Sequence, residues 1–162
     1  MRLFLLSGLM AALLFECVSQ SRAGDQGSPL QHSETMLVEP YRQAAEKRWS
    51  KDFAKFDQEN AQQVGQPDSI LFIGSSSIRR WTSLADDVSP YPVIRRGYGG
   101  AKFTDMGVMV DRLITPHRYR AIVMFIGNGI TGKEEDHTPD QIEQLARYIV
   151  ERSYRHQPDA PF

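Results

Sequence analysis

A short apolar run at residues 70–73 constrains the fold most, because it ends at Gly74 and three serines follow at once. Consecutive apolar residues of this kind are typical of a strand that is buried on both faces of a parallel sheet. The serines would then lie at the carboxyl end of the strand, where open α/β sheets bind ligands. A strand followed by a serine-rich helix cap fits the run equally well. The run predicts a strand and leaves the role of the serines open.

Two later apolar runs are also followed by polar turns. Residues 91–94 precede a glycine-rich turn that ends at Gly100, and residues 121–126 precede a turn that contains Asn128. Strands that alternate with helices form parallel βαβ units, with helices on both faces of the sheet. We therefore expect an α/β protein with a flavodoxin-like three-layer α/β/α fold and strand order 2-1-3-4-5. Helical spacing of apolar residues predicts the covering helices at residues 40–63, 77–85, 103–115 and 138–155.

A serine, a glycine-rich turn and an asparagine thus follow three successive strands. This set resembles the SGNH hydrolases (the GDSL-type esterases and lipases), and more narrowly their platelet-activating-factor-acetylhydrolase-like branch, from about residue 49 to the end of the chain. The resemblance implies that Ser76 is the nucleophile and that Gly100 and Asn128 belong to the oxyanion hole. It also implies a small-molecule ester substrate, such as an acylated sugar or lipid, and no cofactor.

The chemistry explains why these residue types matter together. A serine hydroxyl is a weak nucleophile until a neighbouring base takes its proton. The tetrahedral intermediate needs hydrogen-bond donors aimed at the developing oxyanion. The amides of Ser76 and Gly100 and the side chain of Asn128 would supply three, and a glycine lets backbone approach a substrate closely. Each residue alone also has a plain structural reading as a turn or cap residue.

The sequence departs from the family pattern in three places. Ser75 and Gly129 stand where the family has aspartates, and no aspartate in the chain has a histidine three positions later. The last family block, Asp-x-x-His, is therefore missing. We expect residues 40–162 to form the amino-terminal part of an SGNH domain, with its C-terminal strands missing and the third strand left at an edge. Such a chain should have little esterase activity.

Four histidines are candidates for the missing base. His32 lies before the predicted domain, and His117 and His156 each precede a strand, at the end of the sheet away from Ser76. His137 alone follows a strand on the side of Ser76, which makes it the one internal substitute. It is also simply the residue before a helix cap at Thr138, and this reading stays open.

The beginning of the chain is typical of an export signal. Arg2 precedes an apolar run that is too short to span a bilayer comfortably, and Ala23 follows a Ser-x-Ala cleavage pattern. We expect a signal peptide at residues 1–23, a flexible linker at residues 24–39, a periplasmic or secreted location, and no stable membrane span after cleavage. Acylation of Cys17 is the alternative.

Net charge and composition restrict the partners. The formal net charge is −1 and charged residues make up 24% of the sequence, so nothing indicates nucleic-acid binding. Neither a metal-ligand cluster nor a phosphate-binding loop is present in the sequence. Two arginine pairs, Arg79–Arg80 and Arg95–Arg96, are suited to orient an anionic substrate, but we expect them to be solvated ends of elements. Two functions follow: a serine ester hydrolase, or a catalytically inactive protein that binds a carbohydrate or an acyl ligand.

Overall fold

The computed structural model describes residues 36–62 and 67–162, and its centre is one parallel sheet of three strands. The strands are β1 (Ile70–Gly74), β2 (Val93–Gly97) and β3 (Ala121–Phe125), in the order β2-β1-β3. Gly74 at the end of β1 lies opposite Gly97 on one side and Phe125 on the other. The three strands therefore end at one level of the sheet. This confirms the predicted α/β fold and the first three places of the predicted strand order.

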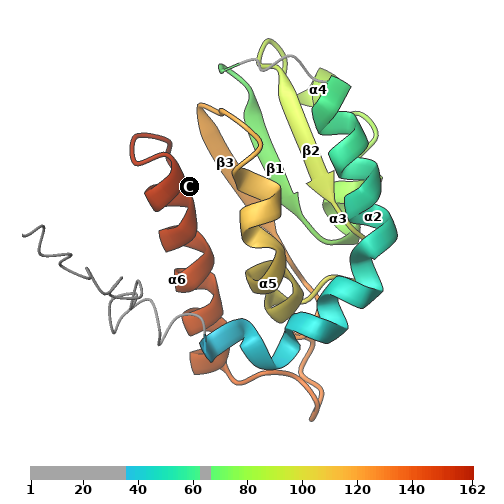
Figure 1. Cartoon of the computed structure of the whole chain (residues 1–162), viewed down its shortest axis with the longest axis vertical. Coiled ribbons are helices and arrows are strands. Elements are labelled where there is room, and N and C mark those ends of the chain that lie inside the picture. Colours follow the sequence, from blue (N-terminus) through green and yellow to red (C-terminus); the bar gives the residue numbers. More distant parts are fainter. Residues whose placement is uncertain (1–35, 63–66) are drawn as a thin grey trace, which may run out of the picture.

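Helices cover both faces of the sheet, as the βαβ pattern predicts. Helices α2, α5 and α6 lie on one face, with α5 beside α6 (Figure 1). The short helices α3 and α4 pack against the other face of β1 and β2. The helical elements are η1 (Glu39–Tyr41), α2 (Arg42–Gln62), α3 (Ser76–Arg80), α4 (Leu84–Asp87), α5 (Phe103–Ile114) and α6 (Pro139–His156). The single helix expected at 77–85 is thus two short helices.

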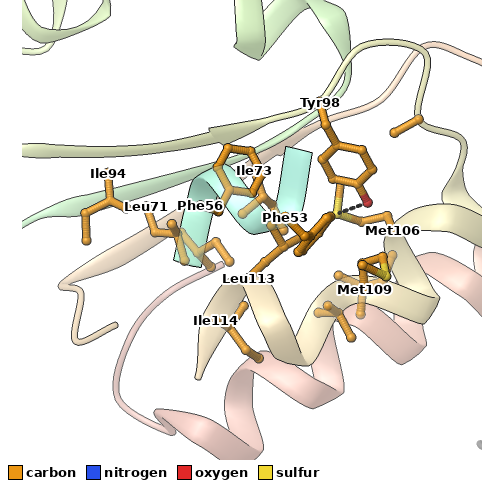
Figure 2. Close-up of a cluster of buried hydrophobic side chains, with 14 of the residues drawn as sticks. Phe53, Phe56, Leu71, Ile73, Ile94, Tyr98, Met106, Met109, Leu113 and Ile114 are labelled. Carbon is orange, nitrogen blue, oxygen red and sulfur yellow. Dashed lines mark hydrogen bonds between the residues drawn. The ribbon is translucent and has the colours of Figure 1, made fainter. Parts of the chain in front are cut away.

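Alternate residues of β1 divide the core into two parts. Leu71 and Ile73 point to the face covered by α2 and α5, where Phe53 of α2 and Leu113 of α5 are also buried (Figure 2). Phe72 points to the opposite face, where the buried residues Ile78 and Leu84 meet it. Burying one such side chain contributes roughly 1.5–3 kcal/mol to folding. The continuous apolar run of β1 is therefore explained by burial on both faces.

The second strand begins later than its apolar run suggests. β2 spans Val93–Gly97, so both Arg95 and Arg96 lie inside the strand. The expectation that this arginine pair is a solvated end is wrong for Arg96, whose side chain is buried. Its guanidinium donates hydrogen bonds to Asn60 at 2.7 and 3.2 Å and to Glu59 at 3.1 Å. These partners on α2 compensate the charge, which makes the burial possible.

Residues 36–39 of the predicted flexible linker 24–39 are helical in the structure. Residues 36–38 form a helical turn, η1 follows, and Val38 is fully buried. Val38 touches the glycine position of α5 at Gly107, where a Cβ would lie 2.9 Å from its side chain. The part of the linker before residue 36 and the predicted signal peptide at 1–23 lie outside the described residues. Within the described ranges, no helix combines the length and apolar character needed to cross a bilayer.

The third strand lies at one edge of the sheet, as the sequence predicts. Val123 and Phe125 are 41% and 54% exposed, although both belong to an apolar run. The last residues of the chain begin to pair with β3 on its outer side, where Ile122 donates its N–H to the carbonyl of Pro161 at 2.9 Å. Val123 and Phe125 are in register with Phe72 and Gly74, so their exposed side chains lie on the same face of the sheet as Phe72, while residue 161 pairs with the backbone edge of β3.

Candidate active site

The carboxyl end of β1 is held by its two neighbouring strands. The N–H of Ser75 donates to the carbonyl of Phe125 at 3.1 Å, and the N–H of Tyr98 donates to the carbonyl of Gly74 at 3.0 Å. Gly74 has a φ of 152°, and a Cβ there would lie 2.2 Å from the Phe125 oxygen. Only glycine fits this approach. The loops that follow the three strands are thereby brought to one place.

Ser76 is the first residue of α3 and lies directly beyond this junction. Its side chain is half-buried, whereas Ser75 is buried and Ser77 is exposed. The first amides of a helix have no partner within the helix. Among the described residues, no backbone carbonyl accepts from the Ser76 N–H. Ser76 is thus partly exposed, and its N–H is available as a donor.

The last residue of β2 and the glycine-rich turn after it pack closely against α3. A Cβ at Gly97 would lie 2.4 Å from the backbone nitrogen of Arg79, and Gly100 has a φ of 84°, a left-handed conformation that glycine adopts without strain. Tyr98 points inward from this turn, where its hydroxyl donates to the sulfur of Met106 at 3.7 Å (Figure 2). Burial raises the pKa of Tyr98 well above its usual range, so its hydroxyl stays protonated and serves as an anchor for the turn.

Asn128 lies against the end of the same turn. Its side-chain amide donates to the carbonyl of Ala101 at 3.0 Å, and its backbone forms a parallel bridge with Lys102. The side-chain amide of asparagine has two hydrogens, so one remains for another acceptor. The N–H of Lys102 donates to Asp105 at 2.9 Å, which fixes the start of α5. Asn128 is thereby held against Ala101, the residue after Gly100.

His137 does not occupy the position that a base for Ser76 requires, which is within hydrogen-bonding distance of the serine hydroxyl. Its Nε2 is 3.3 Å from the hydroxyl of Tyr41 in η1, and no hydrogen bond between described residues joins it to Ser76. The carboxylate of Asp136 accepts from the N–H of Gly132 at 2.9 Å and from those of Thr131 and Lys133. These bonds lower the pKa of Asp136 although desolvation acts to raise it. The loop is therefore held by Asp136, with His137 directed to Tyr41.

The other described histidines gather at the opposite end of the sheet. His156 is within 2.9 Å of the carbonyl of His117, just before β3 begins. Burial, with smaller effects from the charges of Arg96 and His156, lowers the pKa of His117 to about 4. These positions agree with the expectation that both histidines lie away from Ser76. His32 lies outside the described residues.

Two arginines beside the glycine-rich turn were not predicted as site residues. The Nη1 of Arg79 would be 2.9 Å from a Cβ at Gly99, and Nη2 of Arg48 would be 3.4 Å from one at Gly100. The pair Arg79–Arg80 is visible in the sequence, but Arg48 comes from α2 and no local pattern marks it. Throughout the described ranges, no group of three or more His, Cys, Asp or Glu side chains is arranged to hold a metal ion.

Comparisons with known proteins support the fold. No family model and no curated protein sequence matches this chain. A solved structure described as "a putative platelet activating factor from Streptococcus pneumonia" superimposes with a TM-score of 0.60 at 20% sequence identity. The match covers 78% of this chain and 57% of that one, so this chain spans little more than half of the neighbour's length. The likeness shows that the α/β arrangement described above is shared with that protein.

Proposed function

We propose that this domain is a serine ester hydrolase of the SGNH type in which Ser76 is the nucleophile. The amides of Ser76 and Gly100 and the side-chain amide of Asn128 form its oxyanion hole. The substrates are short-chain acyl esters of small molecules, such as acylated sugars or lipids. The description of the structural neighbour is compatible with this proposal. That neighbour is only 20% identical and is matched over 57% of its length, so the proposal rests on the geometry of the site.

The observation that carries the proposal is the convergence of three loops at the carboxyl end of the sheet. Phe125 binds the backbone at Ser75, and the Asn128 side chain binds the residue after Gly100. A partly exposed serine and three candidate donors therefore come from the ends of three successive strands. Each well-placed oxyanion donor is worth about 10²- to 10³-fold in rate.

The reaction would proceed by two acyl transfers. The Oγ of Ser76 attacks the carbonyl carbon, its proton passes to a base, and the carbonyl electrons move onto the oxygen between the three donors. The intermediate then collapses, the protonated base gives its proton to the departing alkoxide, and an acyl-serine remains. Water repeats the sequence on the acyl-serine, releasing the carboxylic acid and restoring Ser76.

The base is the part that these residues do not supply. His137 contacts Tyr41, and the Asp-x-x-His block is absent from the sequence. Loss of a triad member removes several powers of ten in rate and leaves the residual catalysis of the oxyanion hole and binding. We therefore expect weak hydrolysis by this chain and strong hydrolysis when a carboxyl-terminal segment with Asp-x-x-His is attached.

The test compares p-nitrophenyl acetate hydrolysis by this chain and by a fusion that carries such a segment. In the fusion, Ser76→Ala should lower kcat by at least about 10³-fold, whereas Ser77→Ala, on the same helix, should leave it within about threefold. A fluorophosphonate probe should label Ser76. Labelling of Ser75 or Ser77 instead would contradict the assignment, and strong Ser76-dependent turnover by the short chain would make His137→Ala the next variant.

The alternative is a catalytically inactive protein that binds a carbohydrate or an acyl ligand through the same loops. It predicts saturable binding of the ester with no labelling of Ser76 in either the chain or the fusion. The half-buried hydroxyl and the available amide at Ser76 favour the hydrolase. The labelling experiment decides between the two.

A further inference from the structure

A cavity of about 360 Å³ lies beside the candidate active site, at the outer edge of β2. It is bounded by α2, by α3 and α4, and by the strand itself, from Val93 to Gly97. Arg79 belongs both to this cavity and to the site, because it lies one helical turn after Ser76 and its guanidinium packs against Gly99. A ligand that reaches across Arg79 would therefore touch both places.

The charge of the lining is unbalanced. Lys55, Arg79, Arg95 and Arg96 line the cavity, and Glu59 is its one acidic lining residue within the described chain. Glu59 is already engaged, since Arg96 lies 3.1 Å from one of its oxygens and Lys55 lies 3.6 Å from the other. The lining therefore carries three more positive than negative charges, two of them on Arg79 and Arg95 and the third within the group of Lys55, Glu59 and Arg96.

The guanidinium groups of these two arginines form no ion pair with a carboxylate of the described residues. Arg95 donates one bond to the carbonyl of Trp81 at 2.6 Å, and no carboxylate of the described residues lies within ion-pair distance of Arg79 or Arg95. A guanidinium has five donors arranged in a planar fork that matches carboxylate and phosphate oxygens. Two such groups in the lining of one cavity, together with the apolar residues Leu84 and Val93, form a pocket suited to a small organic oxyanion.

We propose that this cavity is an oxyanion subsite, in which Arg79 and Arg95 bind a carboxylate or phosphate group carried by the ester substrate. The inference rests on the proposed function and narrows it, because it assigns the substrate class as anionic esters. Arg79 would link the two parts of the site, because it lines the cavity and its helix carries Ser76.

Binding to the full chain tests the subsite without requiring turnover. Methyl phosphate, acetate and neutral methyl acetate are titrated separately at constant ionic strength, while the arginine Nε–H resonances are followed by NMR. We expect saturable binding of at least one anion with a shift of the Arg79 signal, and none with methyl acetate. Tighter binding of methyl phosphate assigns a phosphate-bearing ester, and tighter binding of acetate assigns a carboxylate.

Variants separate a local site from a general positive field. Arg79→Gln should weaken anion binding about tenfold or more, and Arg79→Lys should restore part of it. Arg48→Gln is the matched control, since it removes a charge near the same turn without lining the cavity; it should change the affinity less than about threefold. Absence of saturation, or equal weakening by Arg48→Gln and Arg79→Gln, would overturn the subsite. If circular dichroism shows that Arg79→Gln does not fold, Arg95→Gln replaces it with the same expected loss.

Failure of this inference and failure of the proposed function look different. An unlabelled Ser76 in the fusion, with Arg79-dependent anion binding intact, removes the hydrolase and leaves the subsite. A labelled Ser76 with no anion binding removes the subsite and leaves the hydrolase.

Discussion

The two edge strands of the sheet, β2 and β3, differ in the polarity of the side chains around them. The β2 flank is polar: Arg96 is buried and donates hydrogen bonds to Glu59 and Asn60, and Arg95 lines the cavity. The β3 flank is apolar: Val123 and Phe125 remain exposed on the same face of the sheet as Phe72. Charged side chains on an edge strand discourage pairing with other chains, whereas an exposed apolar surface beside an edge invites association. Folding stability should therefore depend most on the β2 flank, and solubility most on the β3 flank.

The largest expected effect is on the β2 flank. Arg96→Ala should lower the free energy of unfolding by roughly 3–5 kcal/mol, because it removes a buried cation, leaves Asn60 without its partner and leaves Glu59 paired with Lys55 alone. Urea-induced unfolding followed by circular dichroism measures this. Arg147→Ala, which breaks an exposed ion pair with Glu143 on α6, should change stability by less than about 0.5 kcal/mol. A loss below about 1 kcal/mol for Arg96→Ala would show that the flank is held by other contacts.

The next effect concerns acid stability at the start of the β3 flank. The pKa of His117 is about 4 in the folded protein, below its ordinary value of 6.5, so the unfolded chain binds the proton more readily. The stabilisation is complete above pH 6.5 and is lost as the pH falls to 4, by about 3 kcal/mol. His117→Leu should flatten the dependence of unfolding free energy on pH by about that amount. Parallel curves for the two proteins would contradict the prediction.

The smallest expected effect on stability accompanies the largest on association. Phe125→Thr should change the free energy of unfolding by less than about 1 kcal/mol, since the side chain is 54% exposed and threonine suits a strand. It should reduce self-association, as measured by sedimentation velocity at rising protein concentration. Tyr154→Gln, at a 43% exposed aromatic residue on α6, is the control and should leave association unchanged. Equal effects of the two variants would mean that the β3 flank is no special surface.

The sequence predicted the strands well where apolar residues are buried by helices nearby in the chain. The run ending at Gly74 marks β1, and the capping box at Thr138 marks the start of α6. β2 was placed too early because Arg96 resembles the solvated end of a strand. The burial of the Arg96 side chain depends on Glu59 and Asn60, which belong to a helix far away in sequence. No local sequence pattern predicts such partners.

The candidate site was predictable to the extent that parallel strands end together. Ser76, Gly100 and Asn128 follow three such strands, and the structure brings their loops to one place. What the N-terminal helices contribute was not predictable, since their packing over the turn is a tertiary contact. Arg48 approaches Gly100 in this way, and Tyr41 similarly holds His137.

The close approach at the end of β1 has a consequence for mutation. Every single-base change in a glycine codon that replaces the residue introduces a Cβ, and at Gly74 that atom would meet the carbonyl oxygen of Phe125 at 2.2 Å. No amino acid that is one base away relieves this overlap. Random mutagenesis followed by selection for folded protein should therefore recover no replacement at Gly74, whereas Gly132, which has a similar positive φ but no atom within 4 Å of an added Cβ, should accept some.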